Sequence, residues 1–392
     1  MFVRRLVSLL AVGAIALMPA IGRTAPATGE PYPIDVIIPI TGGGAFIGST
    51  HQKQLVALEG VVNKDGGIQG RPVKFIFHDD QTNPAVSLQL ANEAIAKKPA
   101  VVLGSSLGAL CNATSPLFLN NGPVMYCFSP VIRTVPKSYV FSGSVSGNDL
   151  ILATLKYFHG RGWKKIATLN TTDGSGQIGD ADIARLLATP EFKDMTLLAA
   201  EHFNPSDTSV SAQVSKIKAL NPQALIIWAP GTPFGTALHG LQDVGLNVPV
   251  ATTSANMVVK QMQSYNAFMP KDVYFQGVNY IAGIQHAKET KQMQTFTATI
   301  KEAGIPQDFQ GGMVWDPALI VIDALRKIGP NANATQLRDY LETLHGYQGI
   351  AGTYDFRDGS QRGLGPENAL IMRWDGDKSD FVSVSKAGGV PL

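Results

Sequence analysis

Short apolar runs alternate along the chain with longer segments whose apolar residues recur every three or four positions. The first three runs lie at residues 34–40, 73–77 and 100–103, and helix-like segments separate them. Strands that alternate with helices in this way pair in parallel and need right-handed crossovers. The sequence therefore predicts a parallel sheet covered by helices.

The pattern then restarts, from a short strand at 139–142, which suits a length of 392 residues and suggests two domains. The later strands are predicted at 165–170, 197–203, 224–229, 248–252 and 273–280. Three helices follow, at about 293–303, 317–328 and 335–344, before a turn-rich tail with strand-like runs at 352–356 and 369–374. We expect an α/β fold with two doubly wound parallel sheets.

The turn after the third strand carries hydroxyl groups. Gly104-Ser105-Ser106 interrupts the apolar run that ends at Leu103, and a helix follows from about Leu110. In open α/β sheets, ligands lie at the carboxyl ends of the strands, and a helix N-terminus favours a negative group. The turn is a candidate site for a small anion, although an ordinary strand-to-helix connection has the same composition.

The N-terminus has the layout of a secretory signal peptide. Arg4-Arg5 precedes an uncharged apolar run at 6–18 that is too short to span a bilayer, and Ala25-Pro26-Ala27 fits a cleavage site. Cleavage after Gly22 is the alternative. We expect residues 1–27 to be removed and the mature protein to be exported to the periplasm, without a lipid anchor because no cysteine lies near this boundary.

The composition and the motifs argue against several classes of function. The chain has 32 basic and 30 acidic residues, and loss of residues 1–27 would leave 29 basic residues against 30 acidic ones, so there is no electrostatic reason to expect nucleic acid. The seven histidines and two cysteines show no metal-ligand spacing. Neither a nucleophile elbow nor a P-loop lysine is present. We expect no metal, no cofactor and no catalysis.

Cys111 and Cys127 are the only cysteines. Cys111 falls at the start of a predicted helix and Cys127 towards the end of the next predicted strand, so both lie at the same edge of the sheet. A disulfide in an oxidising compartment would close a loop of about 15 residues and stabilise the fold by about 3 kcal/mol in the chain-entropy model. Two free buried thiols are the alternative.

Several short motifs occur in an order typical of one family. They are the strand at 34–40 followed by Thr41-Gly42, NKDGGIQGR at 63–71, HDDQTNP at 78–84, Gly122-Pro123 with Ser129-Pro130, and NPSDTS at 204–209. Together they resemble the type I periplasmic binding proteins of the branched-chain amino acid kind. The resemblance implies two lobes that are joined by three crossovers and close on a ligand, and an ABC permease in the inner membrane as partner.

The resemblance also implies where the lobes begin and end. We expect lobe 1 at 28–143 plus 280–346 and lobe 2 at 144–279 plus 347–392. The crossovers are expected near 142–147, 276–280 and 344–352. Closure would be a hinge motion stabilised by contacts from both lobes. We expect the protein to act as a monomer.

The family's contacts to a ligand carboxylate fall on the turn after the third strand and just after Ser129-Pro130. In this sequence those positions are Ser105, Ser106 and Gly108 in the turn, and Arg133 beyond the Ser-Pro pair. A guanidinium can bind a carboxylate through two hydrogen bonds, and a solvated surface arginine is the alternative.

The remaining predicted positions are apolar, aromatic or small. Ile47, with Phe46 beside it, is expected to form an apolar wall, and Tyr280 near a crossover is expected to stack or to donate a hydrogen bond. For each of these side chains a place in the core is the alternative.

The positions at which the family holds an ammonium group differ in this chain. Its tyrosine falls on Ser175, the aromatic of the next loop falls near Thr232, and its acid falls near Ser254, where the sequence has no acid. An unpaired ammonium between closed lobes would cost at least about a few kcal/mol. We therefore expect a small aromatic or branched carboxylate rather than a free α-amino acid. Binding of branched-chain or other hydrophobic amino acids, and a sensor role for a receptor or regulator, are the alternatives.

Overall fold

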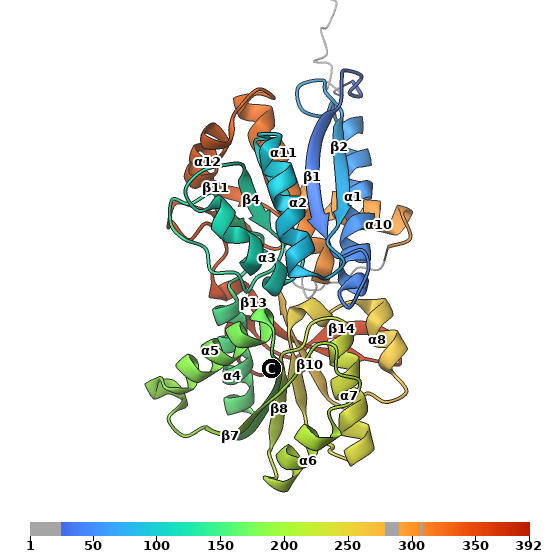
Figure 1. The fold of residues 1–392 in the computed structure, drawn as a ribbon, viewed down its shortest axis with the longest axis vertical. Coiled ribbons are helices and arrows are strands. Elements are labelled where there is room, and N and C mark those ends of the chain that lie inside the picture. Colours follow the sequence, from blue (N-terminus) through green and yellow to red (C-terminus); the bar gives the residue numbers. More distant parts are fainter. Residues whose placement is uncertain (1–24, 279–289, 306–308) are drawn as a thin grey trace, which may run out of the picture.

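One parallel sheet and one mixed sheet, each flanked by helices, form two lobes that lie one above the other (Figure 1). The structure is a computed structural model that describes residues 25–278, 290–305 and 309–392. Most of the predicted signal peptide, and the predicted site residue Tyr280, lie outside these ranges.

The first sheet has the strand order β2-β1-β3-β4-β5, and all of its neighbours are parallel. Its strands are β1 (Tyr32–Ile38), β2 (Val73–Asp79), β3 (Val101–Gly104), β4 (Val124–Cys127) and β5 (Val140–Ser142). Every residue of β3 and β4 is buried, as expected for central strands of a sheet that is covered on both faces.

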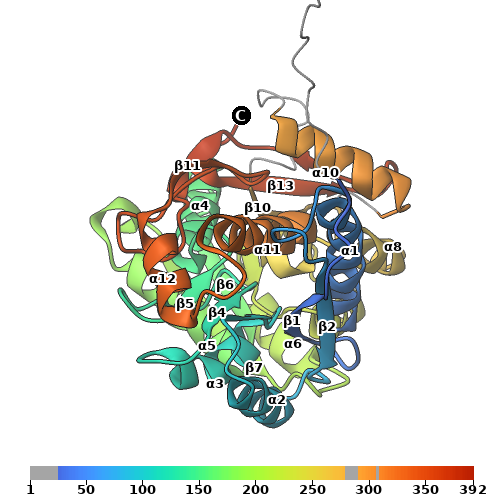
Figure 2. The same cartoon turned by 90° about the horizontal axis from the view of Figure 1, so that it is seen from above.

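Helices from both ends of the chain cover this sheet. They are α1 (Ala45–Lys64), α2 (Pro84–Ala96), α3 (Gly108–Thr114), α10 (Lys291–Glu302), α11 (Phe309–Ile328) and α12 (Ala334–Thr343). Seen from above, α2 and α3 lie on one side of the sheet, and α11 lies on the other side between α1 and α12 (Figure 2). The Arg326 guanidinium of α11 donates to the carbonyl of Gly67 at 2.7 Å, which ties α11 to the loop that follows α1.

The second sheet has the order β14-β13-β10-β9-β8-β6-β7. Its parallel strands are β6 (Lys165–Thr171), β7 (Thr196–Phe203), β8 (Ala224–Ile227), β9 (Val250–Thr252) and β10 (Val273–Val278). Two strands from the chain's tail, β13 (Ala369–Asp375) and β14 (Asp380–Ser383), extend this sheet in antiparallel pairing. The helices of this lobe are α4 (Gly147–Gly160), α5 (Gly174–Leu187), α6 (Ser211–Ala219), α7 (Thr232–Val244) and α8 (Val259–Tyr265). The predicted α/β class and the two lobes are confirmed.

A hairpin of β11 (His345–Gln348) and β12 (Thr353–Asp355) follows α12 and packs on α11. The buried Asp316 carboxylate of α11 accepts hydrogen bonds from the amides of Ile350 and Ala351, each at 2.9 Å, and from the Tyr354 hydroxyl at 3.0 Å. Burial raises the pKa of Asp316 to about 6. These bonds hold the hairpin against the first lobe, whereas the sequence assigned residues from 347 onwards to the second.

A buried arginine ties together segments that connect the lobes. The Arg362 guanidinium donates to the carbonyl of Pro130 at 2.9 Å, to the Ser142 hydroxyl at 2.9 Å and to the carbonyl of Ile132. Burial lowers the pKa of Arg362 to about 10. The guanidinium also donates to the Ser144 carbonyl at 3.4 Å, so four carbonyl or hydroxyl oxygens surround the charge and Arg362 fixes the chain on both sides of β5.

Within the part of the chain that the structure describes, no helix is both long enough and apolar enough to cross a membrane. The same residues contain no group of three or more histidines, cysteines or acids that could hold a metal ion.

Candidate functional site

The two lobes touch at the loops that follow β1 and β8. The amide of Thr232 in the second lobe donates to the carbonyl of Gly43 in the first at 2.9 Å. Gly231, which precedes Thr232, has φ +81° and ψ −146°, a conformation open essentially only to glycine. Asn256 and Gln261 hold this loop, because Asn256 Oδ1 accepts from the Gly231 amide and Gln261 Nε2 donates to the Gly231 carbonyl, each at 2.8 Å.

A second contact between the lobes forms at the N-terminus of α3. The first amides of a helix have no acceptor within it, and Leu107 at the N-cap supplies no side-chain acceptor. The Ser175 hydroxyl of the second lobe accepts from the Ala109 amide at 2.9 Å instead. Ser175 is in the first turn of α5 because Asp173 caps that helix and accepts from the Ser175 amide at 3.1 Å.

This contact requires a glycine at position 108. A Cβ at Gly108 would lie 2.1 Å from Val131 Cγ2 and 3.3 Å from Ser175 Oγ. Gly108 therefore lets α3 approach both the segment after β4 and the second lobe.

A small apolar cluster, separate from the main core, joins the lobes. It consists of the buried residues Ile47, Leu107, Leu110 and Val258, with the partly buried Phe46 and Ala255 packed against it. Three of the four buried members belong to the first lobe, and Val258 precedes α8 of the second. We call this set the inter-lobe cluster. Ser254, a buried residue, is the neighbour of Ala255.

Polar side chains of the first lobe lie beside this cluster in the sequence. His51, one turn after Ile47 on α1, is fully buried, and its Nδ1 lies 2.8 Å from the Ser106 hydroxyl. Its ring also meets Phe128 edge to face, with 5.6 Å between the ring centroids. Ser106 is thus held next to Leu107 of the inter-lobe cluster by a histidine.

Ser105 has a different partner from its neighbour. Its hydroxyl donates to Asp80 Oδ2 at 2.7 Å, and the Thr82 amide donates to Asp80 Oδ1 at 3.0 Å. Asp80 is fully buried, and this burial raises its pKa to about 6. Because each oxygen of Asp80 accepts a hydrogen bond from the protein, this acid holds the turn.

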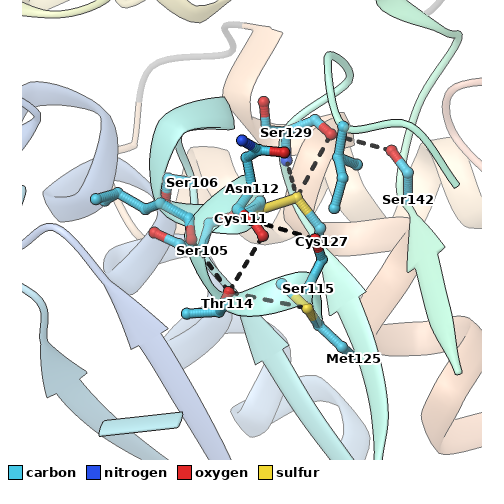
Figure 3. The surroundings of a disulfide bond; sticks show 12 residues. Ser105, Ser106, Cys111, Asn112, Thr114, Ser115, Met125, Cys127, Ser129 and Ser142 are labelled. Carbon is cyan, nitrogen blue, oxygen red and sulfur yellow. Dashed lines mark hydrogen bonds between the residues drawn. A yellow bond between two sulfur atoms is a disulfide. The ribbon is translucent and has the colours of Figure 1, made fainter. Parts of the chain in front are cut away.

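Cys111 and Cys127 form a disulfide, so the predicted bridge is confirmed and the alternative of free thiols is wrong. The bridge joins the second turn of α3 to the end of β4, directly behind the Ser105-Ser106 turn (Figure 3). The Ser129 amide donates to Cys127 Sγ at 3.2 Å. The disulfide therefore fixes both segments on which carboxylate contacts were predicted.

Arg133 contacts an acid of the second lobe and not the inter-lobe cluster. The Arg133 side chain is 69% exposed, and its guanidinium pairs with Asp182 of α5 at 3.0 Å; Asp182 also binds Arg185 at 2.7 Å. Arg133 thus joins the lobes through an acid of the second lobe, and the structure gives its charge a partner other than a ligand.

Of the predicted site residues, the structure brings Ile47, Gly108 and Ser175 to contacts between the lobes, and Ser106 directly precedes Leu107 of the inter-lobe cluster. Thr232 makes such a contact through its amide, and Ser254 is adjacent to the inter-lobe cluster. Sequence reasoning missed His51 and Gln54. Both are polar residues within the buried stripe of α1, and their helical spacing from Ile47 was the available signal.

The model of the periplasmic binding protein family matches residues 31–379, and the chain belongs to that family. No curated protein matches the sequence at a significant level. Members of the family are solute-binding proteins of ABC transporters rather than enzymes, and they bind small molecules in the periplasm.

Solved structures share the fold at low identity. An extracellular ligand-binding receptor from Rhodopseudomonas palustris HaA2 is 21% identical, with a TM-score of 0.78 and coverage of 91% of this chain and 100% of that one. A branched-chain amino acid transporter substrate-binding protein from Streptococcus pneumoniae, in complex with isoleucine, is 16% identical, with a TM-score of 0.73 and coverage of 90% and 98%. A solute-binding protein of an ABC transporter from R. palustris, in complex with benzoate, is 16% identical, with a TM-score of 0.75 and coverage of 91% and 96%.

Proposed function

We propose that the protein is the substrate-binding component of an ABC importer and binds a small organic carboxylate with an aromatic or branched apolar body. The ligand lies between the lobes against the inter-lobe cluster. The observation that carries this proposal is the inter-lobe cluster, an apolar wall that both lobes build, with the neutral residues Ser106 and Ser254 next to its members Leu107 and Ala255 in the sequence.

Two described acids lie at the end of β2, and both are bonded to the protein. Asp79 accepts from the Thr41 hydroxyl at 2.6 Å and from the Ile40 amide at 2.9 Å, and Asp80 accepts from Ser105 and Thr82. An α-ammonium group would lose its hydration without gaining an anionic partner, which disfavours free amino acids. A carboxylate needs only N–H and O–H donors, which the amides of the turn 105–108 and the Ser175 hydroxyl supply.

Closure completes this site, because the Thr232–Gly43 and Ser175–Ala109 bonds join the lobes. Residues 1–27 serve as a cleaved signal peptide, and the loaded protein delivers its ligand to the permease. The related structure with benzoate supports the aromatic carboxylate, and the one with isoleucine supports a branched-chain amino acid as the second candidate.

Calorimetric titration of the mature protein with benzoate, 4-hydroxybenzoate, leucine, isoleucine and glutamate tests the proposal. We expect a carboxylate without an amine to bind most tightly. Tight binding of leucine or isoleucine would overturn the proposed ligand class and favour the second candidate.

A further inference from the structure

One side chain of α1 is buried without a hydrogen bond. Gln54 is fully buried, and neither its Nε2 nor its Oε1 has a hydrogen-bond partner among the described residues. Its amide can donate two hydrogen bonds and accept two, so all of this capacity is unused.

Each of the other buried glutamines in the described part of the chain has at least one hydrogen bond, and Gln361 uses both of its polar atoms. Gln261 Nε2 donates to the Gly231 carbonyl at 2.8 Å, and Gln276 Nε2 donates to the Thr154 hydroxyl at 3.1 Å. In each of these two only the carbonyl oxygen lacks a partner. A buried polar group without a partner costs about 1–3 kcal/mol, and a leucine would fill a similar space without that cost. The glutamine at position 54 therefore calls for a partner outside the described chain.

The position of Gln54 on α1 indicates where that partner lies. Gln54 shares the buried face of the helix with Ile47 and His51, and it lies about 4.5 Å beyond His51 along the axis. Side chains on a helix lean towards its N-terminus. The N-terminus of α1 is the end that carries Phe46 and Ile47 into the inter-lobe cluster, so the amide of Gln54 is directed towards His51 and that cluster.

We propose that Gln54, behind His51, forms the inner end of the ligand site and binds a ligand group that both donates and accepts a hydrogen bond. This inference rests on the proposed function. A hydroxyl or a carboxamide can donate to Oε1 and accept from Nε2, whereas an ionised carboxylate can only accept. The ligand is then a carboxylate that carries a hydroxyl or carboxamide group at its other end.

Pairs of ligands that differ in this one group test the inference. Calorimetry would compare benzoate with 3-hydroxybenzoate, 4-hydroxybenzoate and 4-carbamoylbenzoate on the wild type, on Gln54→Leu and on Gln52→Leu. Gln52 is partly exposed on the same helix and serves as the control. We expect at least one substituted ligand to bind the wild type and Gln52→Leu about tenfold more tightly than benzoate. Gln54→Leu should lose this difference while keeping its affinity for benzoate.

Urea unfolding of the unliganded proteins checks that the variants are folded. Gln54→Leu should be at least as stable as the wild type, because it removes an unpaired buried amide. If carboxylates bind but the substituted ligands have no advantage, or if Gln54→Leu keeps that advantage, the inference is wrong and the proposed function stands. If the wild type binds none of these carboxylates, the proposed ligand class is wrong and the inference fails with it.

Discussion

Replacement of Gly231 by alanine should hold the two lobes apart. A Cβ at this position would lie 2.3 Å from the Gly43 carbonyl oxygen and 3.2 Å from its carbon. A carbon and a carbonyl oxygen approach to about 3.3 Å, so the loops must separate by about 1 Å. That separation breaks the bond from the Thr232 amide to the same oxygen, which measures 2.9 Å.

The expected size of the effect follows from that bond and from the backbone. The lost hydrogen bond is worth about 1 kcal/mol, which corresponds to about fivefold in affinity as a minimum. Alanine at φ +81° adds about 1–3 kcal/mol of strain to the fold. Gly245→Ala is the matched control, because Gly245 also has a positive φ, of +67°, and its Cβ would meet only Lys218 Nζ, at 3.7 Å.

Two measurements on both variants separate closure from stability. Calorimetry with the tightest carboxylate of the panel should show weaker binding for Gly231→Ala and wild-type binding for Gly245→Ala. Small-angle X-ray scattering of the loaded proteins should give a larger radius of gyration for Gly231→Ala alone. If Gly231→Ala binds as tightly as the control and is equally compact, the contact between Gly43 and Gly231 has no part in the ligand-bound state.

Three further changes test other parts of the structure. Cys111→Ser combined with Cys127→Ser should lower the free energy of unfolding by about 3 kcal/mol in urea titrations, and an unchanged midpoint would show that the loop needs no bridge. Asp80→Asn keeps an oxygen that accepts from the Thr82 amide, and its NH2 group donates to the Ser105 hydroxyl, which then accepts. Burial raises the pKa of Asp80 to about 6, so the folded protein binds this proton more tightly than the unfolded chain does. The wild type should therefore lose stability relative to the variant as pH rises from about 4 to 6, and parallel pH profiles would contradict this. Arg133→Gln removes an exposed ion pair between the lobes and should weaken ligand binding no more than about fivefold, whereas the control Arg185→Gln should leave binding unchanged. A loss above about a hundredfold that is confined to carboxylates would show that Arg133 binds the ligand.

The alternation of strands and helices was sufficient to predict both sheets, because each βαβ unit is a local pattern of hydrophobic periodicity. The C-terminal tail was harder to predict from the sequence. The strand Asp380–Ser383 was not predicted, since a short antiparallel edge strand carries little periodicity. The contact of the hairpin at 345–355 with α11 was not predicted, because its anchor, Asp316, lies about 35 residues earlier in the sequence.

The site was predictable where the chemistry is local. The Ser105-Ser106 turn and the Cys111–Cys127 bridge follow from neighbouring segments. The hydrogen-bond partner of each polar group could not be predicted from the sequence. Ser106 pairs with His51, which is 55 residues away, and Ser105 pairs with Asp80, although both serines come from one turn. Such pairings depend on how α1 and β2 are placed, and no sequence spacing reports them.

A crystal structure of the mature protein with its tightest-binding ligand tests the central claim most directly. We predict that the ligand lies between the lobes, with its apolar body on Ile47, Leu107 and Val258 and its carboxylate on N–H and O–H donors. A ligand outside the space between the lobes, or an ammonium group held there by a protein carboxylate, would contradict the account.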